Sequence, residues 1–144
     1  MKSINLFKVM VLTMTFATSA FAHTLKVHIE NLRNEKGSIK YLVFNSEDGY
    51  PDVLKKSLRS GTILASEAAK GIIIENLESG SYSVSVIHDE NDNDKLDTNF
   101  VGIPKEGFGF SNNPTIYFGP PSFDKSKVEV DKDTEITIKM KHFS

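Results

Sequence analysis

The feature that most constrains the fold is an alternation of apolar and polar side chains near the middle of the chain. Tyr82, Val84 and Val86 alternate with serines, directly after a turn at Ser79-Gly80. Successive side chains of a β-strand point to opposite faces, so this pattern predicts a strand with one buried face. We therefore expect sheets, rather than helices, to form the core.

Six further segments have the length and composition of strands and are separated by turn signals. They are residues 24–32, 38–44, 62–66, 71–76, 127–130 and 134–140. The last two are predicted to form a hairpin around the turn at residues 131–133. About seven short strands with turns between them predict an all-β fold, a single antiparallel β-sandwich.

Two segments do not follow this pattern. Residues 51–58 begin with Pro51, which suits a first helical turn, and they predict one short helix. Residues 95–122 show little periodicity and are rich in Gly, Pro, Asn and Phe. A loop of that length is uncommon unless it is functional or disordered, and its aromatic residues argue against disorder. We expect one long ordered loop.

The aromatic residues of this loop allow two interpretations. Phe108 and Phe110 lie on the same side of an extended chain, and Phe118 follows them. They either pack over a sheet edge or form an exposed surface that binds a protein, peptide or glycan.

The first residues predict export. Lys2 and Lys8 accompany an apolar run over residues 9–21, and Ala20-Phe21-Ala22 has the small-x-small pattern of a cleavage site. We expect a signal peptide at residues 1–22, a single domain at residues 23–144, and a location in the periplasm or outside the cell. No other apolar run approaches membrane-spanning length.

Composition narrows the choice of partners and of stabilising devices. The formal net charge is −2, which argues against a nucleic-acid surface. The chain has no cysteine, so no disulfide can stabilise the domain. A bound metal ion is a plausible substitute.

An acidic stretch directly after the alternating strand has the residue types that bind a metal ion. If Asp89 is position 1 of a calcium loop, Asn91 is position 3, Asn93 is position 5 and Asp97 is position 9, while Lys95 offers its backbone carbonyl at position 7. These oxygens can converge on one hard cation. The alternative is a solvated turn, because Asn and Asp favour turns anyway.

The stretch departs from a complete calcium loop at two positions. Asp94 occupies the position where glycine is preferred, and Phe100 occupies the position of the bidentate glutamate. A further ligand would have to come from water, Glu106 or Asp124. With two carboxylates we expect weak binding, with a dissociation constant of roughly 10⁻⁴ to 10⁻³ M.

The histidines suggest a second metal. Cleavage after Ala22 would give His23 a free amine, which can chelate copper together with the imidazole if His28 or His88 supplies a further ring. The alternative is that His23 is a frayed first residue. By strand parity His88 points inward, as a core-edge histidine bonded to a loop carbonyl or as a catalytic base. His142 is expected to face solvent.

No catalytic set is evident. The sequence has no cysteine, no nucleophile-elbow pattern and no glycine-rich phosphate loop. A carboxylate pair for glycoside hydrolysis is not singled out by any spacing. We therefore expect a calcium-stabilised accessory or binding domain. The alternatives are a copper-binding or copper-dependent redox protein and, with less support, a hydrolase.

Two resemblances support this outline. The pattern Leu77-x-x-Gly80-x-Tyr82-x-Val84-x-Val86 looks like a strand signature of transthyretin-like (prealbumin) and carboxypeptidase-regulatory-like sandwiches. The longer stretch from Gly80 to Phe123 resembles a family of exported bacterial proteins classed as a domain of unknown function, DUF2141. Its motifs are residues 88–91, 95–97, 102–106, 108–113 and 118–123. The resemblance implies the fold and export, and it implies no activity.

Overall fold

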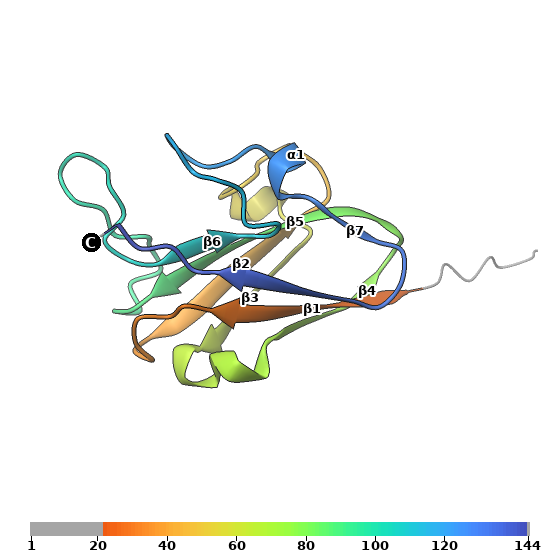
Figure 1. The fold of residues 1–144 in the computed structure, drawn as a ribbon, viewed down its shortest axis with the longest axis horizontal. Coiled ribbons are helices and arrows are strands. Elements are labelled where there is room, and N and C mark those ends of the chain that lie inside the picture. The colour runs from red at the N-terminus through yellow and green to blue at the C-terminus, as the bar shows by residue number, and fades with distance from the viewer. Residues whose placement is uncertain (1–21, 144) are drawn as a thin grey trace, which may run out of the picture.

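The computed structural model describes residues 22–143. Two β-sheets pack face to face (Figure 1), so the predicted all-β sandwich is confirmed. Apart from Ala22, the predicted signal peptide lies outside the described residues.

The smaller sheet, sheet A, has three strands with β1 in the centre. In spatial order these strands are β4 (Ile72–Leu77), β1 (His23–Glu30) and β8 (Thr134–Lys139). The β1–β4 pair is antiparallel, whereas the β1–β8 pair is parallel. This parallel pair departs from the purely antiparallel sandwich that the sequence predicts.

The larger sheet, sheet B, has β5 as its longest strand. Its strands are β3 (Arg59–Leu64), β2 (Ser38–Phe44), β5 (Gly80–Asp89), β6 (Phe108–Phe110) and β7 (Val128–Val130). The last two both pair with β5, β7 near its start and β6 near its end. The end of β5 therefore lies between β2 and β6, and the acidic stretch begins there.

Within residues 22–143, helical structure is limited to three short elements. These are the 3₁₀ helices η1 (Leu54–Lys56) and η2 (Ala65–Lys70) and the α-helix α1 (Phe123–Ser126). The helix predicted at residues 51–58 is thus reduced to the single turn of η1. Ser122 caps α1, since its hydroxyl accepts a hydrogen bond from the Lys125 backbone N–H.

The core lies between the sheets and follows the predicted alternation. Tyr82, Val84 and Val86 of β5 are buried against β1 residues such as Leu25 and Val27. Because one face of each strand is apolar, a register slip of one residue would turn that face to solvent. The burial pattern therefore fixes the register of both sheets.

The predicted hairpin of residues 127–130 and 134–140 is wrong. The two strands form as elements, but β7 pairs with β5 in sheet B, whereas β8 pairs with β1 in sheet A. The turn at residues 131–133 therefore carries the chain from one sheet to the other. Local alternation identifies strands but carries no information about distant partners.

The short strand β6 divides the predicted long loop. Its central residue, Gly109, faces the core, where a Cβ atom would lie 2.5 Å from Ile138 Cγ2. Phe108 and Phe110 consequently share the opposite face, as the sequence predicts, with ring centroids 6.0 Å apart.

Candidate functional site

The acidic loop, residues 89–97, is anchored by a buried carboxylate. The Asp89 side chain is 0 % exposed, and its two oxygens accept hydrogen bonds from the backbone N–H groups of Asn93 (3.2 Å) and Asp94 (2.8 Å). Asp94 has a φ of 64°, in the left-handed region that a calcium loop normally fills with glycine. The loop thus adopts the turn without glycine.

Three side chains at alternate positions of the loop converge. The amide nitrogens of Asn91 and Asn93 each donate to the Asp97 carboxylate at 2.7 Å. These bonds, with Asn93 first, lower the pKa of Asp97 below its usual range. Rotating the Asn91 amide by half a turn would present its oxygen instead, and rotating the Asn93 amide would do the same at the cost of the bond that its oxygen accepts from the Lys95 backbone N–H. Asn91, Asn93 and Asp97 can therefore offer either bonds to one another or oxygens to a cation.

The two remaining predicted ligands lie differently. The Asp89 carboxylate accepts hydrogen bonds from backbone N–H groups. The Lys95 side chain is exposed, and the Lys95 backbone N–H donates to Asn93 Oδ1. Within residues 22–143, no cluster of three or more His, Cys, Asp or Glu side chains has a metal-binding arrangement. An ion at this loop would therefore depend on amide and carbonyl oxygens beside the carboxylates.

Glu106 braces the loop instead of completing a ligand set. Its carboxylate is nearly buried and accepts hydrogen bonds from the backbone N–H groups of Glu90 (2.6 Å) and Asp97 (2.9 Å). Asp124, the other suggested ligand, lies in α1, which packs near the start of β5, where Ser83 donates to the Phe123 carbonyl. Asp124 is therefore at the opposite end of β5 from the acidic loop.

Basic residues from earlier in the chain hold the outside of the loop. Arg33 Nε lies 2.6 Å from Glu90 Oε1, and this bond lowers the pKa of Glu90. Lys40 Nζ lies 2.7 Å from Asp94 Oδ1, which raises the pKa of Lys40. Sequence reasoning missed both contacts, because nothing local links these basic residues to a loop more than fifty residues later.

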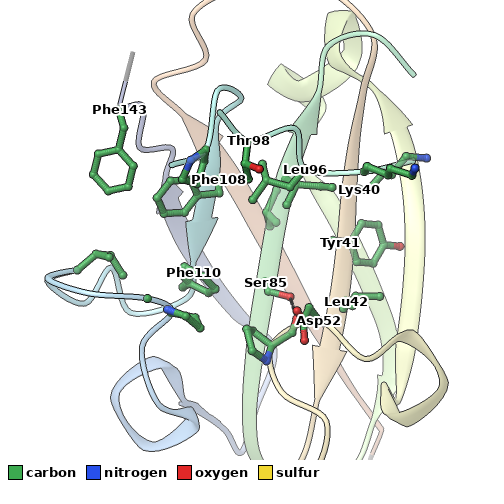
Figure 2. A pocket seen from close by; sticks show the side chains of 18 of the residues that line it. Lys40, Tyr41, Leu42, Asp52, Ser85, Leu96, Thr98, Phe108, Phe110 and Phe143 are labelled. Carbon is green, nitrogen blue, oxygen red and sulfur yellow. Dashed lines mark hydrogen bonds between the residues drawn. The ribbon is translucent and has the colours of Figure 1, made fainter. Parts of the chain in front are cut away.

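A broad groove of about 1,460 Å³ lies beside this loop, on the outer face of sheet B. Figure 2 shows Phe108 and Phe110 of β6, Ser85 of β5 and Leu42 of β2 along the groove. The volume exceeds the 300–1,000 Å³ typical of small-molecule pockets. The groove is therefore large enough for an extended chain molecule.

Two loops with exposed apolar side chains line the groove. Val101 and Ile103 belong to the segment that follows the acidic loop, and Tyr117 and Phe118 belong to the segment after β6. Phe118 is 99 % exposed. Large apolar side chains clustered in the open mark binding surfaces. Of the predicted surface residues, Phe108 and Phe110 therefore lie along the groove and Phe118 lies on its wall.

The four histidines are dispersed. His23 Nε2 contacts Ser79 Oγ at 2.8 Å, and His28 Nε2 contacts Glu135 at 2.9 Å. Five residues of strand separate these two by roughly 16 Å. His88 belongs to sheet B, is fully buried and donates from Nε2 to the Lys36 carbonyl at 2.7 Å, as expected of a core-edge histidine. The structure does not bring the three suggested copper ligands together.

The prediction that His142 faces solvent is wrong. The ring is partly covered and its Nε2 atom is buried, because the chain end folds back along β6 and places the ring against Gly107. A Cβ atom on Gly107 would lie 2.7 Å from this nitrogen. The sequence gives no sign of this packing, since terminal residues usually fray.

The comparisons with known proteins assign the chain to a family. The family model described as "Uncharacterized protein conserved in bacteria (DUF2141)" matches residues 27–139. The chain belongs to this family. Neither the curated proteins nor the solved structures contain a match.

The DUF2141 match begins in β1 and ends in β8, so it includes strands of both sheets, the acidic loop and most of the groove. The family resemblance expected from the sequence is thereby confirmed. No helix in residues 22–143 has the length and apolar character needed to cross a membrane.

Proposed function

We propose that this DUF2141 protein is an exported, non-enzymatic binding domain, with its ligand in the groove on sheet B and calcium at the acidic loop. One observation carries the proposal: the acidic loop and one groove wall are a single continuous segment. Asp97 ends the loop, and its carbonyl accepts a hydrogen bond from the Lys105 N–H at 2.8 Å. Between these residues, Val101 and Ile103 line the groove.

Calcium would act on this segment as a brace. The Asp97 carboxylate accepts hydrogen bonds from two neutral amides. With the amides turned, Asn91, Asn93 and Asp97 supply oxygens, the Lys95 carbonyl supplies another, and calcium accepts such ligands at flexible geometry. An ion there would stiffen the root of the groove wall and take the place of the disulfide that this chain lacks.

The groove would take an extended peptide or a glycan. Its apolar surface offers rings and aliphatic side chains, while Ser85, Thr98 and Lys40 supply a few polar groups. Mostly apolar linings with a few polar groups are the usual composition of ligand sites. A groove of this volume suits a chain molecule better than a compact one.

Calcium binding is tested by thermal melts of the mature chain, residues 23–144, stripped with chelator. Calcium at a hundred times its dissociation constant should add about 2.7 kcal/mol, or very roughly 8 to 15 °C. Asp97→Ala should abolish the rise, whereas Asp131→Ala, at an exposed turn, should keep it. An equal rise with magnesium, or in Asp97→Ala, would refute the loop as a calcium site.

The groove is tested by nuclear magnetic resonance titration with extended peptides and oligosaccharides. Shifted amides should cluster at β6 and at the two wall loops. Phe118→Ser should weaken binding by about tenfold, as expected for an exposed aromatic contact. Ile73→Ser, at a half-exposed site on sheet A, is the matched control. Equal losses in both variants would contradict the assignment.

A copper site at His23 is the alternative proposal. Its support is that His23 Nε2 contacts Ser79, an arrangement that leaves the other ring nitrogen for a chelate with the free amine. Such a site requires cleavage after Ala22 and a further ligand other than His28 and His88, because the structure does not bring those two histidines to His23. Determining the mature N-terminus and titrating copper against His23→Ala separates it from the calcium proposal, because that variant leaves the acidic loop unchanged.

A further inference from the structure

The end of the chain forms a strap across the two sheets. Within this C-terminal strap, residues 140–143, the Met140 N–H donates to the Glu30 carbonyl of β1 at 2.9 Å. One residue later, Lys141 exchanges two backbone hydrogen bonds with Phe108 of β6, at 2.7 and 3.1 Å. The strap therefore leaves sheet A and joins the edge of sheet B.

The last aromatic residue of the strap covers part of the groove. The Phe143 ring lies 5.3 Å from the Phe108 ring, centroid to centroid, and both residues line the groove (Figure 2). Phe108 is 6 % exposed, whereas Phe143 is 54 % exposed. Phe143 thus shields an aromatic side chain that would otherwise be open to a ligand.

His142 holds the strap against sheet B, and one of its polar atoms is buried there. Its Nε2 is buried and, among the described residues, has no hydrogen-bond partner. The ring packs against Gly107, whose carbonyl already accepts a hydrogen bond from the His88 backbone N–H at 2.8 Å. A buried polar atom without a partner is uncommon and calls for an explanation.

The charged groups around His142 come from three neighbouring segments. Burial lowers the pKa of His142, and Arg33 of the β1–β2 connection and His88 of β5 lower it further, while Glu90 of the acidic loop opposes them. Glu106, which precedes Gly107, has both carboxylate oxygens engaged by backbone N–H groups. The surroundings of His142 in the bound strap therefore favour its neutral ring.

We propose that the C-terminal strap is an acid-released latch on the groove, opened when His142 takes up a proton. The charged ring needs acceptors for both of its N–H groups, and Nε2 is buried without one. Protonation therefore favours the detached strap, which exposes Phe108. This role for the strap rests on the groove being the binding site.

The sign of the pH dependence follows from the same geometry. The pKa of His142 is lower with the strap seated than with the strap released, so the released state binds more protons. At a pH above the ordinary histidine pKa of 6.5 the seated state is favoured, and its population falls as the pH drops below 6.5. Between the seated pKa and 6.5, each pH unit can shift the equilibrium by up to tenfold, and below the seated pKa no further shift occurs.

The test is amide hydrogen exchange of the mature chain at pH 7.5 and pH 5.5, corrected for intrinsic rates. Protection of the Phe108 and Lys141 amides should fall at the lower pH, by at most about tenfold. Amides of the β1–β8 pair should keep theirs. His142→Phe retains a ring without a charge, so its strap should show no pH dependence. His28→Asn controls for a partly buried histidine outside the strap. Unchanged protection in the wild type, or the same loss in His142→Phe, would overturn the latch.

A dye separates the latch from the groove assignment. Anilinonaphthalene sulfonate, which fluoresces on apolar surfaces, should bind more strongly at pH 5.5 than at pH 7.5. Phe143→Ser should reach the higher level already at pH 7.5. If exchange depends on pH but dye binding does not, the latch stands and the groove assignment fails. If dye binds the groove equally at both pH values while exchange is constant, the latch is overturned and the groove stands.

Discussion

The acidic loop and the aromatic wall loop, residues 114–120, border the same groove and differ in how their side chains are satisfied. In the acidic loop, Asp89, Asn93 and Asp97 bond to the loop itself. In the aromatic wall loop, Tyr117 and Phe118 stand in solvent. The first loop keeps its shape through internal bonds, while the second has apolar surface that only a partner can bury. Stability and binding should therefore respond to mutation in different loops.

The largest expected effect on stability comes from Asp89→Ala. This substitution removes a buried carboxylate and leaves the N–H groups of Asn93 and Asp94 without acceptors. The free energy of unfolding should fall by about 3 kcal/mol, measured by urea denaturation. Asp131→Ala, at an exposed acid, should stay within about 0.5 kcal/mol. A similar loss of unfolding free energy in both variants would contradict the view that internal bonds hold the acidic loop in shape.

A smaller loss is expected from Glu106→Gln. The amide keeps one acceptor oxygen but turns an NH₂ group toward a backbone N–H, either that of Glu90 or that of Asp97. We expect a loss of about 1.5 kcal/mol in urea denaturation. Glu129→Gln, in the short strand β7, is the control. No loss in Glu106→Gln would mean that the brace is dispensable.

The ion pair between Arg33 and Glu90 should contribute less than about 1 kcal/mol, because both side chains are partly exposed. The bond with Arg33 lowers the pKa of Glu90 in the folded state. The ion pair therefore stabilises the fold at pH values above the unfolded-state pKa of Glu90, near 4.5. This stabilisation is lost as the pH falls through the lower pKa that Glu90 has in the folded state. The difference in melting temperature between wild type and Glu90→Gln should shrink from pH 6 to pH 3; a constant difference would contradict it.

The smallest effect on stability is expected from Phe118→Ser, at less than about 0.5 kcal/mol, because the ring makes almost no contact. The same variant should show the loss of groove binding described above. A large loss of stability in urea would mean that the aromatic wall loop is packed in solution, and it would remove the basis of the contrast.

The sequence predicts the strands well because alternation is a local property. The serines between Tyr82, Val84 and Val86 place β5 and its buried face, and Phe108-Gly109-Phe110 places two rings on one side. Pairing depends on residues far apart. No local pattern distinguishes β8 as a partner of β7 from β8 as a partner of β1, so the hairpin prediction failed.

The candidate site likewise has residues that local spacing predicts and residues that only tertiary packing brings in. The spacing of Asn91, Asn93 and Asp97 indicates their convergence, because alternate side chains of a tight turn face inward. Arg33 and the strap residue His142 reach the site through tertiary packing, and their own neighbours in sequence give no hint of it. The groove itself is a property of the assembled sheet and two loops.

The position of β1 has a consequence for how the chain is made. This strand is synthesised before the other strands that the structure describes, yet in sheet A it lies between β4 and β8, and β8 is the latest of those strands in the sequence. One hydrogen-bonding edge of β1 therefore waits for residues 134–139 to arrive. Such distant pairing is slow to form, and an open edge can recruit other chains meanwhile. A truncated product without β8 should aggregate, whereas a chain that includes β8 can pair both edges of β1.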